Sequence, residues 1–384
     1  MKSSFFFLAS IVLLLFSCDD QSNVATQTSS YSIEIVDSVR IDRIIGSHSI
    51  VAAHPENGNL LLLTKKGDNQ MVLVMSQEGE IIKEFEHLSE GPLSAGIILI
   101  SATFFEDGYA LMGVGNIVTY DANFNVKKRI EVPLSLGGIL ATRSKFLRVI
   151  EKDNRPHFLI FYGPKTEKKS TEAEYYNEYN LLSLVDPENE TIEPYGYFHD
   201  GSMFKSGKAF HFIRTLFEPI GGETKAIVVN DTTLYTFDAS GNEIDRVTIP
   251  FDDYVLLKGF SLGELGLEEQ MKMREVPGAP LGLLHTNGLD IISYRSGIPE
   301  QKAIDLFGPN RENYYKEVYE RVNPRKVIIL KDGRLVSDVL PIPQKLTDLE
   351  IVDPFGNIWA SQNVNILDEE PEVVTIYKLR IVEN

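Results

Sequence analysis

A short pattern of apolar and polar positions recurs along the chain and predicts a repeated β-hairpin. Its clearest copy is Leu234–Val247, LYTFDASGNEIDRV, in which an apolar run, a tight turn and a second run follow one another. Alignment on the turn residue Asp238 brings three further segments into register, with turn residues Ser76, Asp121 and Asp186. A side-chain oxygen at this position can accept hydrogen bonds from the next backbone N–H groups. Residues that tolerate a positive φ follow in three copies, at Gly79, Asn189 and Gly241.

A second recurring signal is a turn that contains glycine and leads into an apolar strand. Its copies are Glu56–Thr64, Glu106–Gly113, Thr286–Tyr294, Lys331–Asp338 and Pro354–Ser361. Two segments match the strand without the turn glycine, Arg155–Gly163 and Glu223–Asp231. In several places this strand precedes the hairpin unit. Together the two signals supply three of the four strands of a propeller blade.

The spacing of the repeats predicts an all-β fold, a β-propeller. The four turn residues lie 45, 65 and 52 residues apart, as in proteins built from multi-stranded repeats. About 350 residues follow the N-terminal segment, which at about 50 residues a blade favours six blades, with seven as the alternative. A single sandwich needs only about 100 residues. We expect Tyr31–Ile41 to pair with Val373–Val382, because pairing of the first and last strands closes the ring and removes exposed edges.

Three segments interrupt the strand pattern. Lys165–Tyr179 is polar with a run of tyrosines, and we expect a long surface loop there. Leu262–Glu275 is predicted as a short helix capped by Ser261. Arg311–Val322 places tyrosines and valines on one helical face and is the clearest helix signal in the chain.

The first residues predict an exported protein. Residues 1–17 contain Lys2 and the apolar run Phe5–Phe16, which is too short to span a bilayer and is typical of a secretory signal. Cys18, the single cysteine, stands where a lipobox places the lipid-modified residue, although Phe16 is bulkier than usual there. The alternative is an ordinary signal cleaved near Ser17. We expect lipid attachment at Cys18, a flexible tether over 18–30 and one propeller domain over 31–384, held at the cell envelope, most plausibly the outer membrane.

Composition excludes several classes of function. The net charge of −18 would repel nucleic acid, and no basic stripe offsets it. A single cysteine allows neither an internal disulfide nor a thiolate metal site. The chain has no Gly-x-Ser-x-Gly elbow and no His-Glu-x-x-His helix, and its seven histidines are dispersed. We therefore expect no catalytic constellation, metal or cofactor.

Four residues are candidates for ligand binding. Tyr195–Pro219 is rich in phenylalanine, and a strand through it would place Phe210, Phe212 and Arg214 on one face and His211 on the other. Arg214 then either points into the central funnel as an anion or peptide anchor, or pairs with one of the many carboxylates. His211 accompanies it, and the pair Tyr294-Arg295 at a strand end offers a similar arrangement.

Several motifs resemble those of a known group. Asp353 followed by PFGNIWAS resembles the Asp-x-x-Gly-Asn-(Ile/Leu)-Trp turn and strand of propeller sensor repeats. The lipobox, the acidic pair after Cys18 and the Gly91-Pro92 turn resemble uncharacterised six-bladed, TolB-like propeller lipoproteins of Bacteroidota. The resemblance implies a six-bladed fold and an outer-membrane lipoprotein at the periplasmic or the surface face, since Asp19 and Asp20 match the acidic surface-export signal of the group only in part, and it supplies no catalytic residue. Asp353 and Trp359 themselves suggest either a blade turn with its packing aromatic or a carbohydrate-binding aromatic.

Two functional hypotheses follow, and a third is open. The first is a non-enzymatic, lipid-anchored propeller that binds a peptide, glycan or protein partner at its axial funnel or loop face. The second is an enzyme of the propeller type, a lyase, lactonase or glycosidase, acting at the same axis. The third is a structural subunit of an outer-membrane complex. A lining of arginine and aromatic residues favours binding, whereas three carboxylate or imidazole groups around a metal favour an enzyme.

Overall fold

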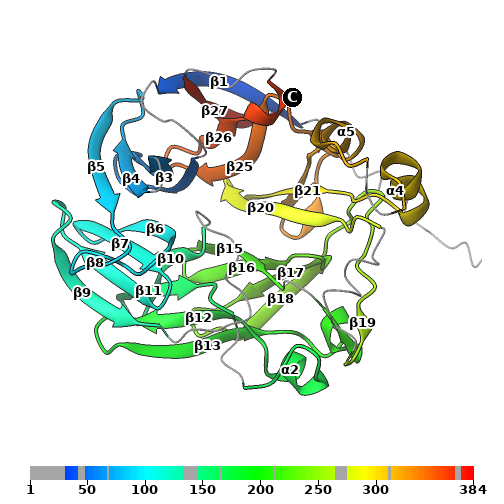
Figure 1. Cartoon of the computed structure of the whole chain (residues 1–384), viewed down its shortest axis with the longest axis horizontal. Helices are drawn as coiled ribbons and strands as arrows, with labels where there is room; N and C mark the ends of the chain where they lie inside the picture. The colour runs from blue at the N-terminus through cyan, green and yellow to red at the C-terminus, as the bar shows by residue number, and fades with distance from the viewer. Residues whose placement is uncertain are drawn as a thin grey trace, which may run out of the picture.

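The described residues form six antiparallel blade sheets arranged in a ring, five of them four-stranded and one five-stranded (Figure 1). The computed structural model describes residues 31–41, 48–66, 69–132, 145–163, 167–210, 213–263, 275–309, 313–367 and 373–384. The predicted signal segment, Cys18 and the tether lie outside these residues. The first strand of each blade lies nearest the axis, and the strands follow one another outward. This confirms the predicted six-bladed β-propeller.

The strands of the six blades have the following bounds. Blade 1 contains β2 (Ser49–Ala53), β3 (Leu60–Lys66), β4 (Asn69–Met75) and β5 (Ile81–His87). Blade 2 contains β6 (Leu99–Phe105), β7 (Gly108–Gly113), β8 (Asn116–Tyr120) and β9 (Val126–Glu131). Blade 3 contains β10 (Leu147–Lys152), β11 (Arg155–Ile160), β12 (Asn180–Asp186) and β13 (Thr191–Tyr197). Blade 4 contains β15 (Thr215–Ile220), β16 (Glu223–Val228), β17 (Thr233–Phe237) and β18 (Glu243–Thr248).

The last two blades depart slightly from this plan. Blade 5 contains β20 (Ala279–Thr286), β21 (Leu289–Arg295), β22 (Lys326–Lys331) and β23 (Arg334–Leu335), with β24 (Leu340–Pro341) also paired to β22. Blade 6 contains β25 (Leu346–Val352), β26 (Ile358–Gln362), β27 (Val374–Glu383) and β1 (Tyr31–Ile41). β1 pairs antiparallel with β27 from Tyr31 opposite Glu383 to Ile41 opposite Val374. The predicted closure by the first and last strands is therefore confirmed.

Burial along the strands explains the hydrophobic pattern. Leu60–Leu63 in β3 are all buried, because a middle strand has a neighbouring blade on each of its faces. The outer strand β5 alternates between half-buried and exposed residues, since one of its faces meets solvent. The apolar clusters accordingly lie between successive blades, and the lone tryptophan, Trp359, is fully buried in one of them. Its Nε1 donates to Asp353 Oδ2 at 3.0 Å. Trp359 is therefore the packing aromatic of a blade turn, which was the first of the two alternatives for this motif.

The turn residues act as the sequence pattern predicts. Oδ1 of Asp121 accepts hydrogen bonds from the N–H groups of Asn123 and Asn125 at 2.8 and 2.9 Å, and Asp238 holds the same turn. Ser76, Asp186 and Asp353 make equivalent bonds. One detail was wrong: in the Asp186 turn the residue with positive φ is Glu190, at 57°, and not Asn189.

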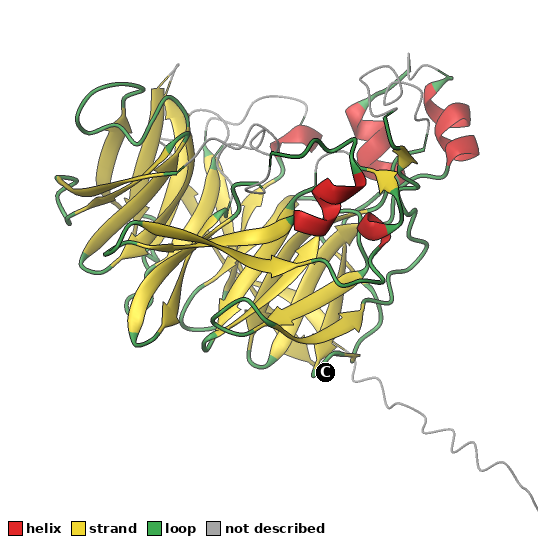
Figure 2. Ribbon diagram, turned by 90° about the horizontal axis from the view of Figure 1, so that it is seen from below, coloured by secondary structure: helices red, strands yellow, loops and turns green. Residues whose placement is uncertain are grey.

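The helices lie at one end of the ring, which we call the helix face (Figure 2). They are α2 (Ala173–Glu178), η1 (Met203–Lys205), α4 (Glu300–Phe307), α5 (Lys316–Val322) and η2 (Val364–Ile366). The short pair β14 (Lys208–Ala209) and β19 (Phe260–Ser261) lies in connections at the same end. The tight turns after the first and third strands of the blades form the opposite end, which we call the turn face.

Three local expectations were wrong or incomplete. Lys165–Tyr179 is not only a surface loop, because α2 buries Tyr175 and Tyr176 against an aromatic cluster that contains Phe210. α5 begins at Lys316, within a shorter range than predicted, and α4 was not foreseen. The strand expected through Phe210–Arg214 is interrupted, since β14 ends at Ala209 and β15 begins at Thr215. Most of the helix predicted at Leu262–Glu275 lies outside the described residues.

Candidate functional site: the axial cavity

A cavity of about 340 Å³ lies on the axis of the ring, lined by residues of inner strands and by residues that immediately precede them. It is bounded by β2, β15, β20, β25 and the residues just before β10. Inner strands run from the helix face toward the turn face, so the cavity belongs to the helix-face half of the molecule. Its charged and titratable lining residues are His48, Lys145, Arg214, Asp348 and Glu350. Its larger apolar lining residues are Ile50, Phe146, Leu216, Phe217, Leu281, Leu283 and Leu349.

Arg214 immediately precedes β15 and contributes its side chain to the cavity wall. Its backbone C=O accepts from the Val229 N–H at 2.8 Å, which fixes the residue to blade 4. In the part of the chain that the structure describes, its guanidinium forms no ion pair and no hydrogen bond. Burial lowers the pKa of Arg214, and the negative charge of Asp348 opposes this shift. An arginine nevertheless stays protonated, so the wall carries a positive charge that the neighbouring groups only partly compensate.

Thr215 adds a second polar group to the same wall. Its side chain is completely buried, and Oγ1 has no hydrogen-bond partner among the residues that the structure describes. A buried hydroxyl without a partner costs free energy, so such groups are uncommon in folded proteins. Arg214 and Thr215 are thus adjacent groups in the cavity wall, and neither has a side-chain partner among the described residues.

Lys145 stands on another side of the cavity, just before β10. Its Nζ donates to the backbone C=O of Glu350, and within the described ranges no carboxylate oxygen lies at ion-pair distance from it. Burial, reinforced by the positive charge of Arg148, lowers the pKa of Lys145 to about 8, although the carboxylates of Glu218, Glu350 and Asp348 oppose the shift. Lys145 is therefore an amine that loses its proton unusually easily.

Glu350 occupies the inner strand β25 and is held from two sides. Oε1 accepts from Ser361 Oγ at 2.5 Å, and Oε2 accepts from the Ile50 N–H. Burial raises the pKa of Glu350 to about 7, against the effect of these two hydrogen bonds and of Lys145. The cavity therefore contains an easily deprotonated amine and an easily protonated carboxyl group, each in a fixed position.

Asp348 connects the cavity to the helix face. Arg325 Nε lies 2.9 Å from Asp348 Oδ1, and Arg325 Nη1 donates to Glu320 of α5 at 3.1 Å. Arg295 Nη2 also donates to Glu320, at 2.6 Å. Two arginines thus share one glutamate, and one of them reaches the cavity wall through Asp348.

Of the four residues predicted to bind a ligand, the structure brings Arg214 to the axis. Tyr294 and Arg295 lie in β21, inside blade 5, and neither lines the axial cavity. Tyr294 packs on Phe251, with ring centroids 4.6 Å apart. The Arg295 guanidinium lies 5.0 Å from the centre of the Tyr319 ring, in addition to its pairing with Glu320. His211 lies outside the described residues.

The sequence analysis missed Lys145, Asp348 and Glu350. The signal that could have found them is position: Lys145 lies just before an inner strand, as Arg214 does, and Asp348 and Glu350 lie within the inner strand β25. This requires knowing which strand begins each blade, and the turn-based repeats align the outer strands instead.

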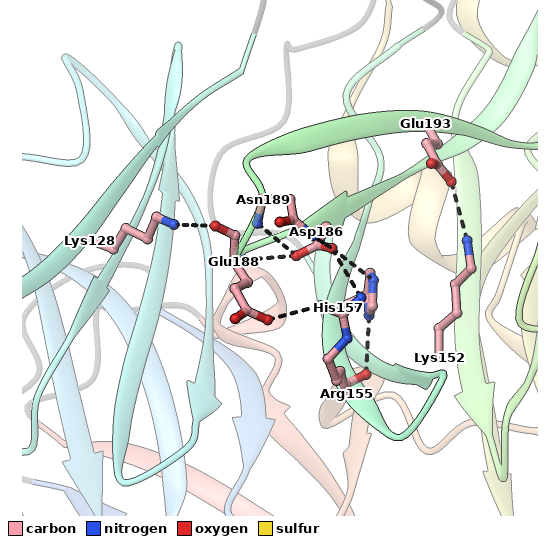
Figure 3. A network of polar contacts seen from close by, with 8 residues as sticks. All are labelled: Lys128, Lys152, Arg155, His157, Asp186, Glu188, Asn189 and Glu193. Carbon is pink, nitrogen blue, oxygen red and sulfur yellow. Dashed lines mark hydrogen bonds and ion pairs between the residues drawn. The ribbon is translucent and has the colours of Figure 1, made fainter.

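A second polar cluster lies on the turn face of blade 3, around a pocket of about 160 Å³ (Figure 3). Asp186 accepts hydrogen bonds from the backbone of Glu188 and from the backbone and side chain of Asn189. Its Oδ2 lies 3.7 Å from His157 Nε2 and 3.5 Å from Arg155 Nη2. Burial opposes ionisation of Asp186, but the bonds from Asn189 and Glu188, with the field of His157, lower its pKa to about 2.

The cations of this cluster also have partners. Arg155 Nη1 donates to Glu188 Oε2 at 2.9 Å, Lys128 donates to the Glu188 C=O at 2.8 Å, and Lys152 pairs with Glu193 at 3.2 Å (Figure 3). His157 Nδ1 lies 3.1 Å from the Arg155 carbonyl oxygen. The cluster joins two turns of blade 3 to blade 2 and has the character of a structural network.

Across the described ranges, no three histidine, cysteine, aspartate or glutamate residues are close enough together to hold a metal ion. Within the same ranges, no helix has the length and apolar character needed to cross a membrane.

No protein-family model matches the chain, and no curated protein matches it. Solved structures do resemble it. A member of the DUF4221 family from Bacteroides vulgatus superposes with a TM-score of 0.64 at 10% identity, covering 93% of this chain and 100% of that one. A Bacteroides fragilis protein whose name describes it as exported superposes with a TM-score of 0.56 at 12% identity, covering 93% and 97%. At such identities the likeness concerns the fold: this chain is a six-bladed propeller similar to Bacteroides propellers.

Proposed function

We propose that the protein is a lipid-anchored β-propeller of the cell envelope that binds an anionic ligand in its axial cavity. The observation that carries this proposal is Arg214, a largely buried cation in the cavity wall without a partner in the described part of the chain. Burying a charge is costly unless it is paired, so an anion bound beside Arg214 would recover free energy that the burial of this cation costs. Peptide carboxyl termini and acidic sugars have this chemistry.

The form of the cavity supports the same proposal. Its volume suits a small ligand or the end of a chain, and apolar side chains accompany a few polar groups, as in small-molecule sites generally. Phe146 and Phe217 provide aromatic surface, while Arg214 and Thr215 provide donors. This is the mixed arginine and aromatic lining that favours a binding module.

The envelope part of the proposal rests on the N-terminal sequence. Phe5–Phe16 and Cys18 match a lipoprotein signal, and the similar Bacteroides fragilis propeller is named as exported. We assign the chain on this basis to the TolB-like propeller lipoproteins of Bacteroidota. Expression of the Cys18→Ser variant should move the protein from the membrane fraction to the soluble fraction. Retention in the membrane would contradict the lipid anchor and leave the cavity proposal unaffected.

Ligand binding is tested by thermal unfolding with acetate, succinate, diglycine and galacturonate as probes. At least one of them should raise the Tm of the wild type, since a ligand at 100 times its Kd stabilises by about 2.7 kcal/mol. The shift should disappear in Arg214→Gln and persist in Arg155→Gln, a control arginine on the turn face. A shift that survives in Arg214→Gln, or no shift with any carboxylate, would overturn the proposal.

A propeller enzyme with its site at the axis is the second candidate. The favouring observation is the pair Lys145 and Glu350, whose pKa values both move toward neutrality in one cavity. Groups tuned in this way are common where a proton is moved during a reaction. A lyase, lactonase or glycosidase of this kind would lose its activity in Glu350→Gln, whereas a pure binding module would keep its ligand.

A further inference from the structure

We propose that Lys145 is a reactive amine that forms an imine with a carbonyl ligand carrying an anionic group, a 2-oxo acid being the simplest example. The inference rests on the axial cavity being the ligand site, and it adds a covalent step to it. Its basis is the placement of Lys145: a primary amine in the wall of the axial cavity, held at Nζ by a backbone carbonyl.

Comparison with other lysines shows why Lys145 differs. Lys225 is paired with the buried carboxylate of Asp290, Lys326 lies 3.2 Å from Asp252 and Lys152 lies 3.2 Å from Glu193. A carboxylate partner stabilises the charged ammonium form. The Glu350 carbonyl that binds Lys145 is itself neutral, and it can accept an N–H from a neutral amine as well as from an ammonium group. Together with burial, which lowers its pKa to about 8, this leaves the nitrogen lone pair of Lys145 available near neutral pH.

The reaction is balanced without a redox partner. The amine lone pair attacks the carbonyl carbon, and a proton passes from nitrogen to the new oxygen to give a carbinolamine. The hydroxyl group then takes one proton and leaves as water while the carbon–nitrogen double bond forms as an iminium, and loss of the remaining nitrogen proton gives the imine. Glu350, held by Ser361 and Ile50 with its pKa raised to about 7, is the carboxyl group suited to carry these protons.

The anionic part of the ligand follows from Arg214. A 2-oxo acid carries its carboxylate on the atom next to the carbonyl carbon, so a single small molecule presents both groups that this wall recognises. Arg214 would bind the carboxylate, and the ligand carbonyl would face Lys145. Recognition of the ligand carboxylate depends on the proposed anion site, whereas the reactivity of Lys145 toward carbonyl compounds does not.

The test is reductive trapping on the full chain in detergent. The protein is incubated at about pH 7.5 with glyoxylate and sodium cyanoborohydride, and the modified lysines are located by peptide mass spectrometry. Lys145 should be modified about tenfold faster than Lys152 or Lys205, which pair with Glu193 and Asp200, since burial favours the free-amine form of Lys145 and its Nζ has no carboxylate partner in the described ranges. Its rate should rise with a midpoint near pH 8, whereas exposed lysines should continue to gain reactivity above that pH.

Matched variants separate the two layers of the proposal. Lys145→Arg should lose the fast adduct, with Lys145→Gln as a second variant and unfolding curves to verify folding, while Lys152→Arg should keep it. Arg214→Gln should lose the preference for glyoxylate over acetaldehyde but keep the acetaldehyde adduct. Labelling of Lys145 no faster than of exposed lysines would overturn the imine proposal. Fast labelling by both aldehydes without preference for glyoxylate would uphold Lys145 and refute the anion site.

Discussion

The axial cavity and the blade 3 cluster contain similar charged residues, but they differ in whether these charges have partners within the protein. Around Asp186 every charged side chain drawn in Figure 3 has a partner, and the carboxylate is stabilised in its ionised form. In the axial cavity Arg214 lacks a partner in the described chain, and Lys145 and Glu350 are each displaced toward their neutral forms. Charges that a fold uses for its own stability are satisfied within it. Groups left unsatisfied in a cavity are better explained by a ligand than by folding.

The largest effect is expected where a satisfied pair is broken. Glu320→Ala would leave the guanidinium groups of Arg295 and Arg325 without their shared carboxylate, although their side chains are only 8% and 13% exposed. Loss of one partner from a buried pair costs about 3–5 kcal/mol, so the free energy of unfolding should fall by about this amount. Urea denaturation measures it. Glu243→Ala, which removes an exposed pair with Arg246, is the control and should cost under about 1 kcal/mol.

Glu350→Gln, in the axial cavity, should raise the free energy of unfolding, whereas Glu320→Ala lowers it. The raised pKa means that the folded chain retains a proton between pH 4.5 and about 7 that the unfolded chain releases. The stability from this group is therefore fully present below pH 4.5 and lost as the pH rises through about 7. The neutral amide should stabilise the protein by about 1–2 kcal/mol at pH 8 and give little difference at pH 4. A variant less stable than wild type at pH 8 would contradict this assignment.

Asp186→Asn tests the satisfied cluster by pH. The lowered pKa of Asp186 means that its contribution is present above the ordinary carboxyl range, near 3.8, and is lost as the pH falls through about 2. The variant keeps one acceptor oxygen but loses the charge, so we expect a deficit of about 1 kcal/mol at pH 7 that shrinks below pH 4. Asp238→Asn, in an equivalent turn without His157 and Arg155, should show a smaller deficit in the same unfolding experiment.

The smallest effect on stability is expected from Arg214→Leu. Because Arg214 has no ion pair to lose within the described residues, its removal should change the free energy of unfolding by less than about 1 kcal/mol, and in the stabilising direction. Chemical denaturation at pH 7 measures the change. A loss of several kcal/mol would show that Arg214 has a structural partner and would remove the contrast between the two regions.

Much of the fold follows from short-range rules that the sequence displays. The hairpin turns were found because Asp121, Asp186 and Asp238 organise their own backbones through bonds to residues two to four places ahead. The blade count and the closure of β1 on β27 followed from the repeat length and the need to remove exposed edges. α2 was missed because its tyrosines resemble a polar loop until Phe198 and Phe210 are known to pack on them.

The site was harder to predict because its residues come from five blades. Arg214 stood out by its aromatic surroundings, but Lys145 and Glu350 are separated by 205 positions and have no local pattern. Only ring closure brings them together. Tyr294-Arg295 had the same local signature as Arg214 and lies inside blade 5, so the local signal does not distinguish a cavity wall from a blade interior.

The position of the two chain ends has a practical consequence for measurement. Tyr31 pairs with Glu383 at the turn-face end of blade 6, and Figure 2 shows the C-terminus at the end away from the helices. An affinity tag that follows Asn384 would therefore immobilise the protein on a sensor chip with its axial opening toward the flowing buffer. Small probes could then reach Arg214 and Lys145, because the tag holds every molecule by the end opposite the cavity.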